Sequence, residues 1–263
     1  MTGEIYKKLI KNNFSQASSF YNQNAHIQRE VTKKLINLLE ENCSKSNVNY
    51  QRTLDLGCGS GFFLEYIRNH DNYGKIINYD ISKQMLNISQ KSNINSLSVQ
   101  GDMDFLPFKK NSFDLIFSAF SIQWSQNINL LIKELFNLLE NDGIMALSFP
   151  NILSLKQLRN ISKKSGCDFF FIKMPRHADV KNYIKNCQFN FILSKQEQVY
   201  QKFSSPLGAI KNMKKIGANY SGNQKNIVSK KNIKNFANYR NNGNLFNSDW
   251  NISYFICIKN NVS

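Results

Sequence analysis

Short apolar segments alternate with segments of helical periodicity between residues 46 and 150. Strands of a parallel sheet, joined by helices on both faces, produce this pattern. Residues 52–59 are expected to be a strand followed by a turn, and the other expected strands are residues 75–82, 96–103, 113–124 and 143–150. The expected helices are residues 62–70, 82–92 and 128–140. With 263 residues, 41% of them hydrophobic, the chain is long enough for one large α/β domain with its own core, or for a domain plus a subdomain.

The flanking segments have a different pattern. Residues 5–42 are expected to be helical, because apolar side chains recur at helical spacing without a proline. After Pro150 we expect helices at residues 154–164, 178–187, 206–218 and 231–242, and strands at residues 189–203 and 250–259. The two helices between these last strands are expected to cover the carboxyl edge of the sheet. Ser82 is expected to cap the helix that follows it.

The charge is concentrated in the second part of the chain. The net charge is +16, of which residues 1–150 contribute +1 and residues 151–263 contribute +15. A positive field attracts polyanions such as nucleic acid, anionic lipid or an acidic protein. Biased use of lysine would spread the charge evenly, so a functional cause is favoured. We therefore expect three parts in one domain: a helical lid (1–45), a ligand-binding core (46–150) and a basic half that binds the acceptor or a partner (151–263).

A glycine-rich turn follows the first expected strand. In "LDLGCGSGFF", glycines stand at positions 57, 59 and 61, between a strand and a helix. Such a turn is either a plain tight turn or a place where a ligand approaches the backbone, because glycine has no Cβ. The spacing differs from the dinucleotide GxGxxG motif and from a phosphate loop, so no pyrophosphate cradle is required.

Three acidic residues end three successive strands. Asp55 precedes the glycines, Asp80 lies 25 residues further on, and Asp102 ends the third strand. In doubly wound folds an acid at the place of Asp80 accepts hydrogen bonds from ribose hydroxyls. Each acid alone could cap a helix, but the set of three with the glycines indicates a ligand crevice.

The segments "LDLGCGSG", "NYDISKQML" and "GDMDFLPFKKNSFDLIFSAFSIQW" resemble the motifs of class I S-adenosylmethionine-dependent methyltransferases. This resemblance implies a Rossmann-like, mostly parallel seven-stranded sheet with an antiparallel last strand. It also implies S-adenosylmethionine as cofactor: the methionine end near Asp55 and the glycines, the ribose on Asp80, and the adenine on Asp102 and the Met103 backbone. The cofactor-binding residues are then expected to be Asp55, Gly57, Cys58, Gly59, Gly61, Asp80, Ile81, Met85, Asp102, Met103 and Ser118.

Four further segments are similar to the malonyl-acyl carrier protein O-methyltransferases of biotin synthesis. They are "FSQASSFYNQNAHIQREVTKKL", "SFDLIFSAFSIQWSQN", "ELFNLLENDGIMALSFP" and "SSPLGAIKNMKKIGAN". The resemblance implies methylation of the free carboxylate of a malonyl thioester. An acidic acyl carrier protein would then dock on the basic half, with candidate contacts at Lys211, Lys214, Lys215 and Arg240, and Lys230, Lys231 and Lys234 behind them.

A carboxylate acceptor needs no strong general base, since its pKa lies near ~4. The sequence has no convincing Ser-His-Asp or Cys-His arrangement, which agrees with catalysis by alignment and desolvation. Orienting residues for the acceptor are expected from the lid and from the end of the fourth strand, with Arg176 and His177 as further options. The expected acceptor group is Tyr21, His26, Gln123 and Trp124.

Other interpretations remain open on the sequence alone. The acceptor could be another small molecule, such as a quinone precursor, or RNA, although no RNA-binding module is recognisable. The chain could also be a non-catalytic relative that binds the cofactor, as an assembly factor does. No metal site, signal peptide or apolar run of ~18 residues is found, and the five cysteines form no CxxC pair. A monomer in a reducing cytoplasm is expected.

Overall fold

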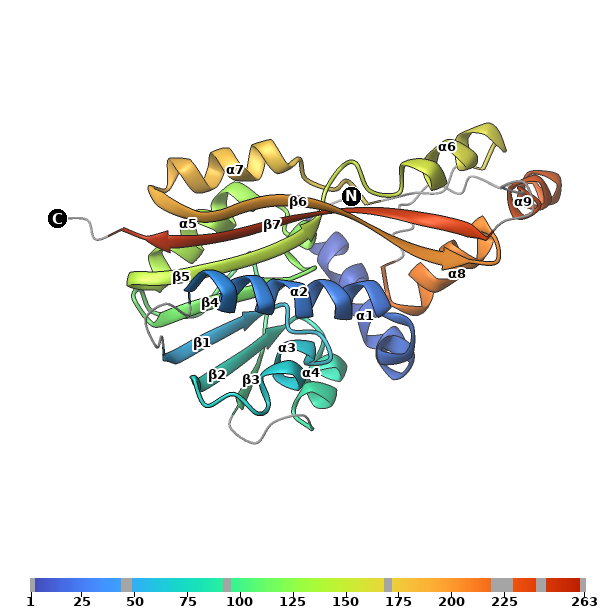
Figure 1. Cartoon of the computed structure of the whole chain (residues 1–263). Helices are drawn as coiled ribbons and strands as arrows, with labels where there is room; N and C mark the ends of the chain where they lie inside the picture. The colour runs from blue at the N-terminus through green and yellow to red at the C-terminus, as the bar shows by residue number, and fades with distance from the viewer. Residues whose placement is uncertain are drawn as a thin grey trace.

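The computed structural model describes residues 3–43, 49–91, 96–167, 172–218, 229–239 and 245–260. These ranges form one seven-stranded sheet in the order β3-β2-β1-β4-β5-β7-β6, with helices on both faces (Figure 1). The strands are β1 (Tyr50–Leu56), β2 (Tyr73–Asp80), β3 (Ser96–Gln100), β4 (Phe113–Ala119), β5 (Leu139–Pro150), β6 (Phe189–Phe203) and β7 (Phe246–Lys259). Strands β1 to β5 are parallel, and β7 is antiparallel to both neighbours. The expected fold class, with its antiparallel last strand, is confirmed.

The helices are α1 (Gly3–Asn24), α2 (His26–Cys43), α3 (Phe62–Ile67), α4 (Lys83–Ser89), α5 (Ile128–Leu138), α6 (Lys156–Lys164), α7 (His177–Asn186), α8 (Pro206–Lys215) and α9 (Lys230–Ala237). Successive residues of a strand face opposite sides of the sheet, so β4 contributes to two cores. Leu115 and Phe117 pack with α2 and α3, whereas Ile116 packs with α5 and α7. None of the helices in the described ranges is long and apolar enough to cross a membrane.

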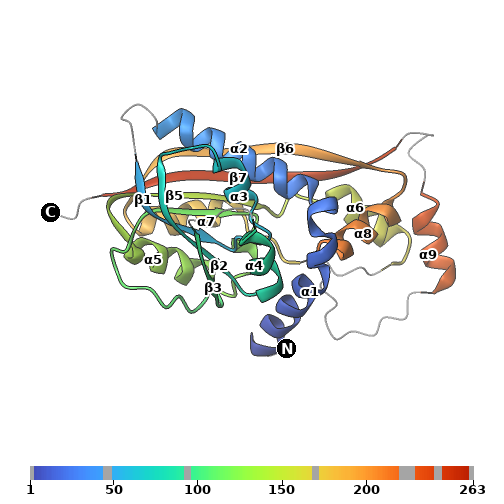
Figure 2. The same ribbon diagram turned by 90° about the horizontal axis from the view of Figure 1, so that it is seen from below.

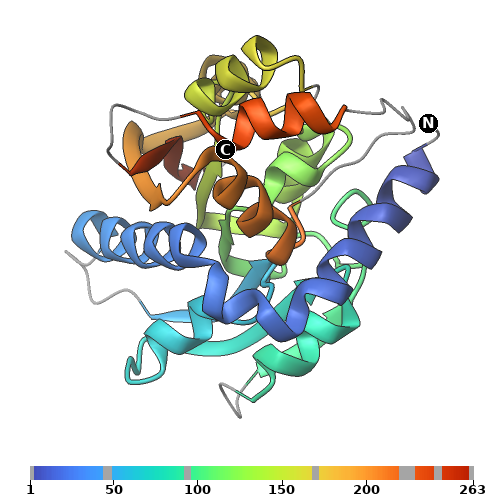
Figure 3. The ribbon, with the colours of Figure 1, turned by 90° about the vertical axis from the view of Figure 1, so that its right-hand side faces the viewer.

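The helix expected over residues 5–42 is in fact two helices. Ala25 is fully buried and packs with Phe62 and Ile216, so the chain turns there around the start of α3. Figure 3 shows α1 and α2 meeting at an angle. The expected cap of α4 is present: the Ser82 hydroxyl accepts a hydrogen bond from the Met85 amide at 3.3 Å.

Strands β6 and β7 extend beyond the rest of the sheet. The last pair between β7 and β5 is Ile252 with Pro150, whereas β7 remains paired with β6 as far as Phe246 and Phe203. The outer part of β6 and β7 is therefore a two-stranded ribbon, and the segment between them contains α8 and α9. Figure 2 shows α8 beside α1 and α9 further out, both on the carboxyl side of the sheet, as expected from the sequence. Figure 3 shows the same helices from the end of the ribbon.

Candidate active site

A cavity lies at the carboxyl ends of β1, β2 and β4, where the strand order reverses between β1 and β4. Open α/β sheets bind ligands at such a switch point, because loops from the two sides diverge there. Helices α1 and α2 form the side of the cavity that faces away from the strand ends. Its lining is Lys7, Ile10, Phe14, Tyr21, Gln28, Thr32, Asp55, Gly57, Cys58, Gly59, Phe62, Phe63, Tyr79, Asp80, Ile81, Met85, Gly101, Asp102, Met103, Phe117, Ala119, Phe120, Ser121 and Trp124.

The glycine turn brings bare backbone to this cavity. Gly57 has φ +70°, and a Cβ at this position would lie 2.4 Å from the Ser121 Cβ. Only glycine therefore fits between β1 and the loop after β4. Gly59 has φ +53°, but no atom outside its chain neighbours lies within 4 Å of where its Cβ would be. The open space beside Gly59 is room for a ligand.

Asp80 organises the turn from the end of β2. Its carboxylate accepts hydrogen bonds from the Gly59 amide at 3.0 Å and from the Ser82 amide at 2.8 Å. Burial raises the pKa of the Asp80 carboxyl to about 6, although these amide donors lower it. The carboxylate thus holds the glycine turn and the start of α4 in place, and Asp80 also lines the cavity.

Asp55 is the most deeply buried acid of the site. It is 3% exposed, and within the described ranges its Oδ2 atom has no hydrogen-bond partner. Burial, and to a smaller extent the charge of Asp80, raise the pKa of Asp55 well above its usual value. A buried carboxylate without a partner is costly, so this oxygen indicates a place for a hydrogen-bond donor or a cation from a ligand.

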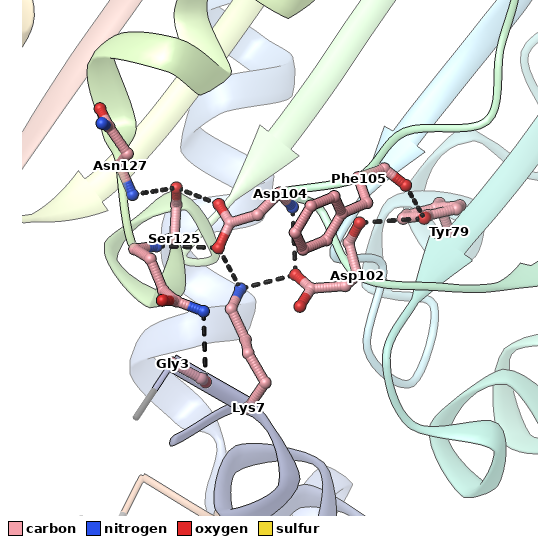
Figure 4. Close-up of polar contacts among 9 residues, drawn as sticks. Gly3, Lys7, Tyr79, Asp102, Asp104, Phe105, Ser125 and Asn127 are labelled. Carbon is pink, nitrogen blue, oxygen red and sulfur yellow. Dashed lines mark hydrogen bonds and ion pairs between the residues drawn. The ribbon is translucent and has the colours of Figure 1, made fainter. Parts of the chain in front are cut away.

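Asp102 is tied to the N-terminal helix. The Lys7 ammonium on α1 lies 2.6 Å from Asp102 Oδ1 and 2.7 Å from Asp104 Oδ2 (Figure 4). The Tyr79 hydroxyl donates to the Asp102 carbonyl at 3.1 Å and fixes the loop from the other side. The Gln126 backbone N–H donates to the Asp104 carboxylate at 2.9 Å, so the same pair of acids reaches the loop after β4. This network closes α1 over the end of β3.

Replacing Lys7 by methionine is expected to loosen α1. The three side chains are 10 to 20% exposed, and removing the cation leaves two neighbouring carboxylates without this partner, at a cost of about 1–3 kcal/mol. Hydrogen exchange should become faster in α1 than in α2, while Lys8→Met on the exposed side of the same helix should leave both unchanged. Equal exchange in the two variants would contradict a fastening role for Lys7.

The structure places most of the expected cofactor residues together. Nine of the eleven line the cavity, while Gly61 and Ser118 do not. Gly61 precedes α3, and a Cβ there would lie 2.9 Å from the Ser89 Cβ, so it allows close packing on α4. Ser118 is fully buried, and its hydroxyl donates to the Leu56 carbonyl at 2.9 Å. Both residues therefore stabilise the elements that form the cavity without lining it.

The expected acceptor group is divided. Tyr21 and Trp124 line the cavity, where Tyr21 stacks on Phe62 and Trp124 meets the ring of Phe14 edge-on. His26 is exposed on α2 and does not belong to the lining. The Gln123 amide donates to the Phe120 carbonyl at 2.7 Å, and the side chain borders a separate surface depression. The structure therefore brings two of the four residues to the cavity.

The two further options also lie elsewhere. Arg176 is exposed at the start of α7. His177 stacks on Phe255 and lies within hydrogen-bond distance of the Ser253 and Ser194 hydroxyls, at 3.0 and 3.3 Å. These contacts give His177 a place in the packing of α7 against the sheet.

The sequence interpretation missed the contribution of the N-terminal helices. Residues Lys7, Ile10 and Phe14 of α1 and residues Gln28 and Thr32 of α2 line the cavity. The helical phase was a usable signal, because Gln28 and Thr32 are one turn apart beside the buried Ile27 and Val31. Polar residues on the buried side of a helix call for a partner, and here the cavity lies in front of them.

The residues fit S-adenosylmethionine. The cavity offers carboxylates, bare backbone and aromatic rings, and its one basic side chain in the described lining, Lys7, is paired with acids. An acidic lining favours a positive sulfonium and would repel a pyrophosphate. The strand order and this crevice define a class I S-adenosylmethionine-dependent methyltransferase.

Comparison with known proteins agrees with this class. Residues 54–147 match the family model described as a methyltransferase domain. The malonyl-acyl carrier protein O-methyltransferase of Buchnera aphidicola is 30% identical over 88% of this chain and 89% of its own length. The chain belongs to the malonyl-acyl carrier protein O-methyltransferase family.

Two further comparisons extend this result. A second enzyme of that name, from Coxiella burnetii, is 28% identical over 81% of this chain and 82% of its own length. Among solved structures, the YcgJ protein of Bacillus subtilis has a TM-score of 0.61 at 17% identity, over 87% of this chain and 99% of its own. The second likeness concerns the fold alone.

Proposed function

We propose that this methyltransferase transfers a methyl group from S-adenosylmethionine to the free carboxylate of a malonyl thioester carried by an acyl carrier protein. The product would be the methyl ester that starts biotin precursor synthesis. The observation that carries the proposal is the extent of the likeness to the Buchnera enzyme. It covers 88% of the chain and so includes acceptor-side segments beyond residues 54–147, which match the general methyltransferase model.

The chemistry of the cavity supports this acceptor. Its described lining contains no histidine, Lys7 is engaged by Asp102 and Asp104, and the carboxylates of Asp55 and Asp80 are assigned to the cofactor. An acceptor that must lose a proton would need a base at this place, whereas a malonyl carboxylate is already ionised at neutral pH. The aromatic rings of Phe14, Phe120 and Trp124 form a wall that excludes water from the reacting groups.

The cofactor would lie along the crevice with its parts on different strands. Asp80 would accept from the ribose hydroxyls, since its carboxylate is fixed by the Gly59 and Ser82 amides. The adenine would lie near Met103 and Asp102. Asp102 uses Oδ1 for its bonds with Lys7 and the Asp104 amide. The methionine end would lie along the glycine turn toward Asp55.

Cofactor affinity is expected to depend on pH through Asp80. With a pKa of about 6, the free carboxyl is protonated in mild acid and ionised at neutral pH. The ionised form is the better acceptor for a ribose diol, so affinity for S-adenosylhomocysteine should rise about tenfold between pH 5 and pH 7 and then level off. Calorimetry measures this directly, and Asp80→Asn should remove the step.

Folding stability should respond to Asp80 in the opposite direction. The folded pKa of about 6 lies above the ordinary value of 3.8, so the folded state holds the proton more tightly. The resulting stabilisation is complete below about pH 4 and is lost as the pH rises to about 6. For the binding prediction, an affinity for S-adenosylhomocysteine that rises as the pH falls in the wild type would contradict the role of the Asp80 carboxylate as ribose acceptor.

Bound S-adenosylmethionine supplies an electrophilic methyl group on a positively charged sulfur. The part of this chain is to hold the acceptor in line with that methyl group, and alignment can contribute about 7–11 kcal/mol in favourable systems. Tyr21 is the donor best placed for the acceptor carboxylate. Burial, with a smaller effect of Asp80, raises the pKa of the Tyr21 hydroxyl, which therefore stays protonated and able to donate.

An acidic carrier protein would dock at α8 and α9. These helices contain no acidic residue, and their six lysines are exposed in the structure: Lys211, Lys214 and Lys215 on α8, and Lys230, Lys231 and Lys234 on α9. Arg240 lies outside the described residues. Helix α8 lies against α1, where the Asn212 side-chain amide donates to the Asn24 carbonyl at 3.2 Å, and α9 lies further out beyond α8 (Figure 2). A thioester arm from a carrier docked on α8 would therefore enter the cavity past α1.

The proposal is tested by incubating the protein with labelled S-adenosylmethionine and malonyl-acyl carrier protein, followed by mass analysis for the methyl ester. Acetyl-acyl carrier protein is the matched control, because it lacks the free carboxylate. Malonyl-coenzyme A in a parallel reaction determines whether the carrier is required. Cofactor binding without a methyl ester on either malonyl thioester would refute the proposed acceptor and favour a non-catalytic role, another small acceptor or RNA.

A further inference from the structure

Two buried polar side chains line the same cavity from different elements. Asp55 on β1 has an Oδ2 atom without a hydrogen-bond partner among the described residues, and Gln28 on α2 has its side chain in the cavity lining. Gln28 is 6% exposed, and no hydrogen bond engages this amide in the part of the chain that the structure describes. Buried polar groups are normally hydrogen-bonded, so both groups indicate a ligand that completes them.

Gln28 lies beside the glycine turn. The next residue, Arg29, has its guanidinium 4.3 Å from the centre of the Phe62 ring and pairs with Glu65, both on α3. The first turns of α2 therefore rest on the start of α3, directly after Gly57 to Gly61 (Figure 2). Thr32, one turn further along α2, donates its hydroxyl to the Gln28 carbonyl at 2.8 Å. The Thr32 proton is used within the helix, so the donor that α2 offers to the cavity here is the Gln28 amide.

The charges of the lining restrict the ligand group. Lys7 is the basic side chain of the described lining, and it is held by Asp102 and Asp104 at the end of β3. A carboxylate bound near the glycine turn therefore meets neutral donors, which suits a carboxylate whose charge is balanced within its own molecule. An α-amino acid end has this property, because an ammonium accompanies the carboxylate, and Asp55 is available for the ammonium.

We infer that Gln28 is a specificity-determining residue that binds the carboxylate of the cofactor's amino-acid end, while Asp55 takes its ammonium. The inference depends on the cofactor and not on the malonyl acceptor. Gln28 would donate a hydrogen bond through its side-chain amide. Because this donor is neutral, it adds no charge to an amino-acid end whose carboxylate and ammonium already cancel. The lid helices and the glycine turn thus hold opposite sides of one group.

Calorimetric titration of Gln28→Ala with three ligands tests the inference. S-adenosylhomocysteine has the whole amino-acid end, decarboxylated S-adenosylmethionine lacks the carboxylate, and methylthioadenosine lacks the entire end. Affinity for S-adenosylhomocysteine should fall about tenfold, the usual value of a hydrogen bond to a charged group, while the other two affinities stay within about twofold. Gln28→Glu should weaken S-adenosylhomocysteine further, because two carboxylates then face each other.

Two controls keep the result interpretable. Gln23→Ala removes an exposed glutamine at the end of α1 and should leave all three affinities unchanged. Thermal unfolding of the ligand-free variants reports whether Gln28→Ala alters the fold. An equal loss for all three ligands, or no loss for S-adenosylhomocysteine in a folded variant, overturns the inference. If malonyl thioester KM rises while S-adenosylhomocysteine affinity is unchanged, the amide serves the acceptor carboxylate and the inference also fails.

Discussion

The Asp80→Ala variant is expected to lose at least about a hundredfold in affinity for S-adenosylhomocysteine. The carboxylate is predicted to accept two ribose hydroxyls, and hydrogen bonds to a charged acceptor are among the strong ones. Its loss also releases the Gly59 and Ser82 amides, which hold the glycine turn and the start of α4. The measurement is calorimetry at pH 7.5, where the wild-type carboxyl, with its pKa of about 6, is ionised.

A matched variant separates the site from general effects of charge. Asp71 is exposed between α3 and β2, so Asp71→Ala should bind S-adenosylhomocysteine like the wild type. Thermal unfolding of Asp80→Ala without ligand reports whether the release of the Gly59 and Ser82 amides alters the fold. A dissociation constant within about twofold of the wild type would contradict the placement of the ribose on Asp80.

Reversing the charge of α8 is expected to impair the reaction with the carrier protein more than the reaction with coenzyme A. The variant combines Lys211→Glu, Lys214→Glu and Lys215→Glu, all at exposed positions. Steering by a basic surface raises association rates tenfold or more, so kcat/KM for malonyl-acyl carrier protein should fall at least about tenfold at low salt. Malonyl-coenzyme A should lose much less, because it presents fewer charges to this surface.

Salt distinguishes docking from damage. The Debye length falls to ~8 Å at physiological ionic strength, so the difference between variant and wild type should shrink as salt is added. The matched control reverses Lys75, Lys109 and Lys110, which are exposed near the amino ends of β2 and β4, and it should leave kcat/KM for malonyl-acyl carrier protein unchanged. Equal losses in both triple variants would show that net charge, and not α8, matters.

Local patterns in the sequence predicted the elements of the fold well. The cap of α4 by Ser82 depends on neighbouring residues alone, and it is present. The break at Ala25 could not be predicted in this way, because alanine favours a helix on local grounds. The chain turns there since Ala25 packs on Phe62 and Ile216, which come from two other parts of the sequence. Only the tertiary structure brings these residues together.

The same distinction holds for the site. The carboxyl ends of parallel strands meet at one edge, so Asp55, Asp80 and Asp102 could be placed around one crevice from the strand pattern. The contribution of α1 and α2 to the cavity could not be predicted, because no local signal states where these helices lie on the sheet. His26 and Gln28 are two residues apart on α2, and the phase of the helix turns one to solvent and the other to the cavity.

The two-stranded ribbon of β6 and β7 has a consequence for changes in chain length. Between Phe246 and Asn251, β7 pairs with β6 and with no third strand in the described ranges. A change in the length of the exposed parts of the segment between β6 and β7 would therefore leave the register of the strands that form the crevice unaltered. Ile216 is the point in this segment that such a change must preserve, because it packs on Ala25 and Phe62.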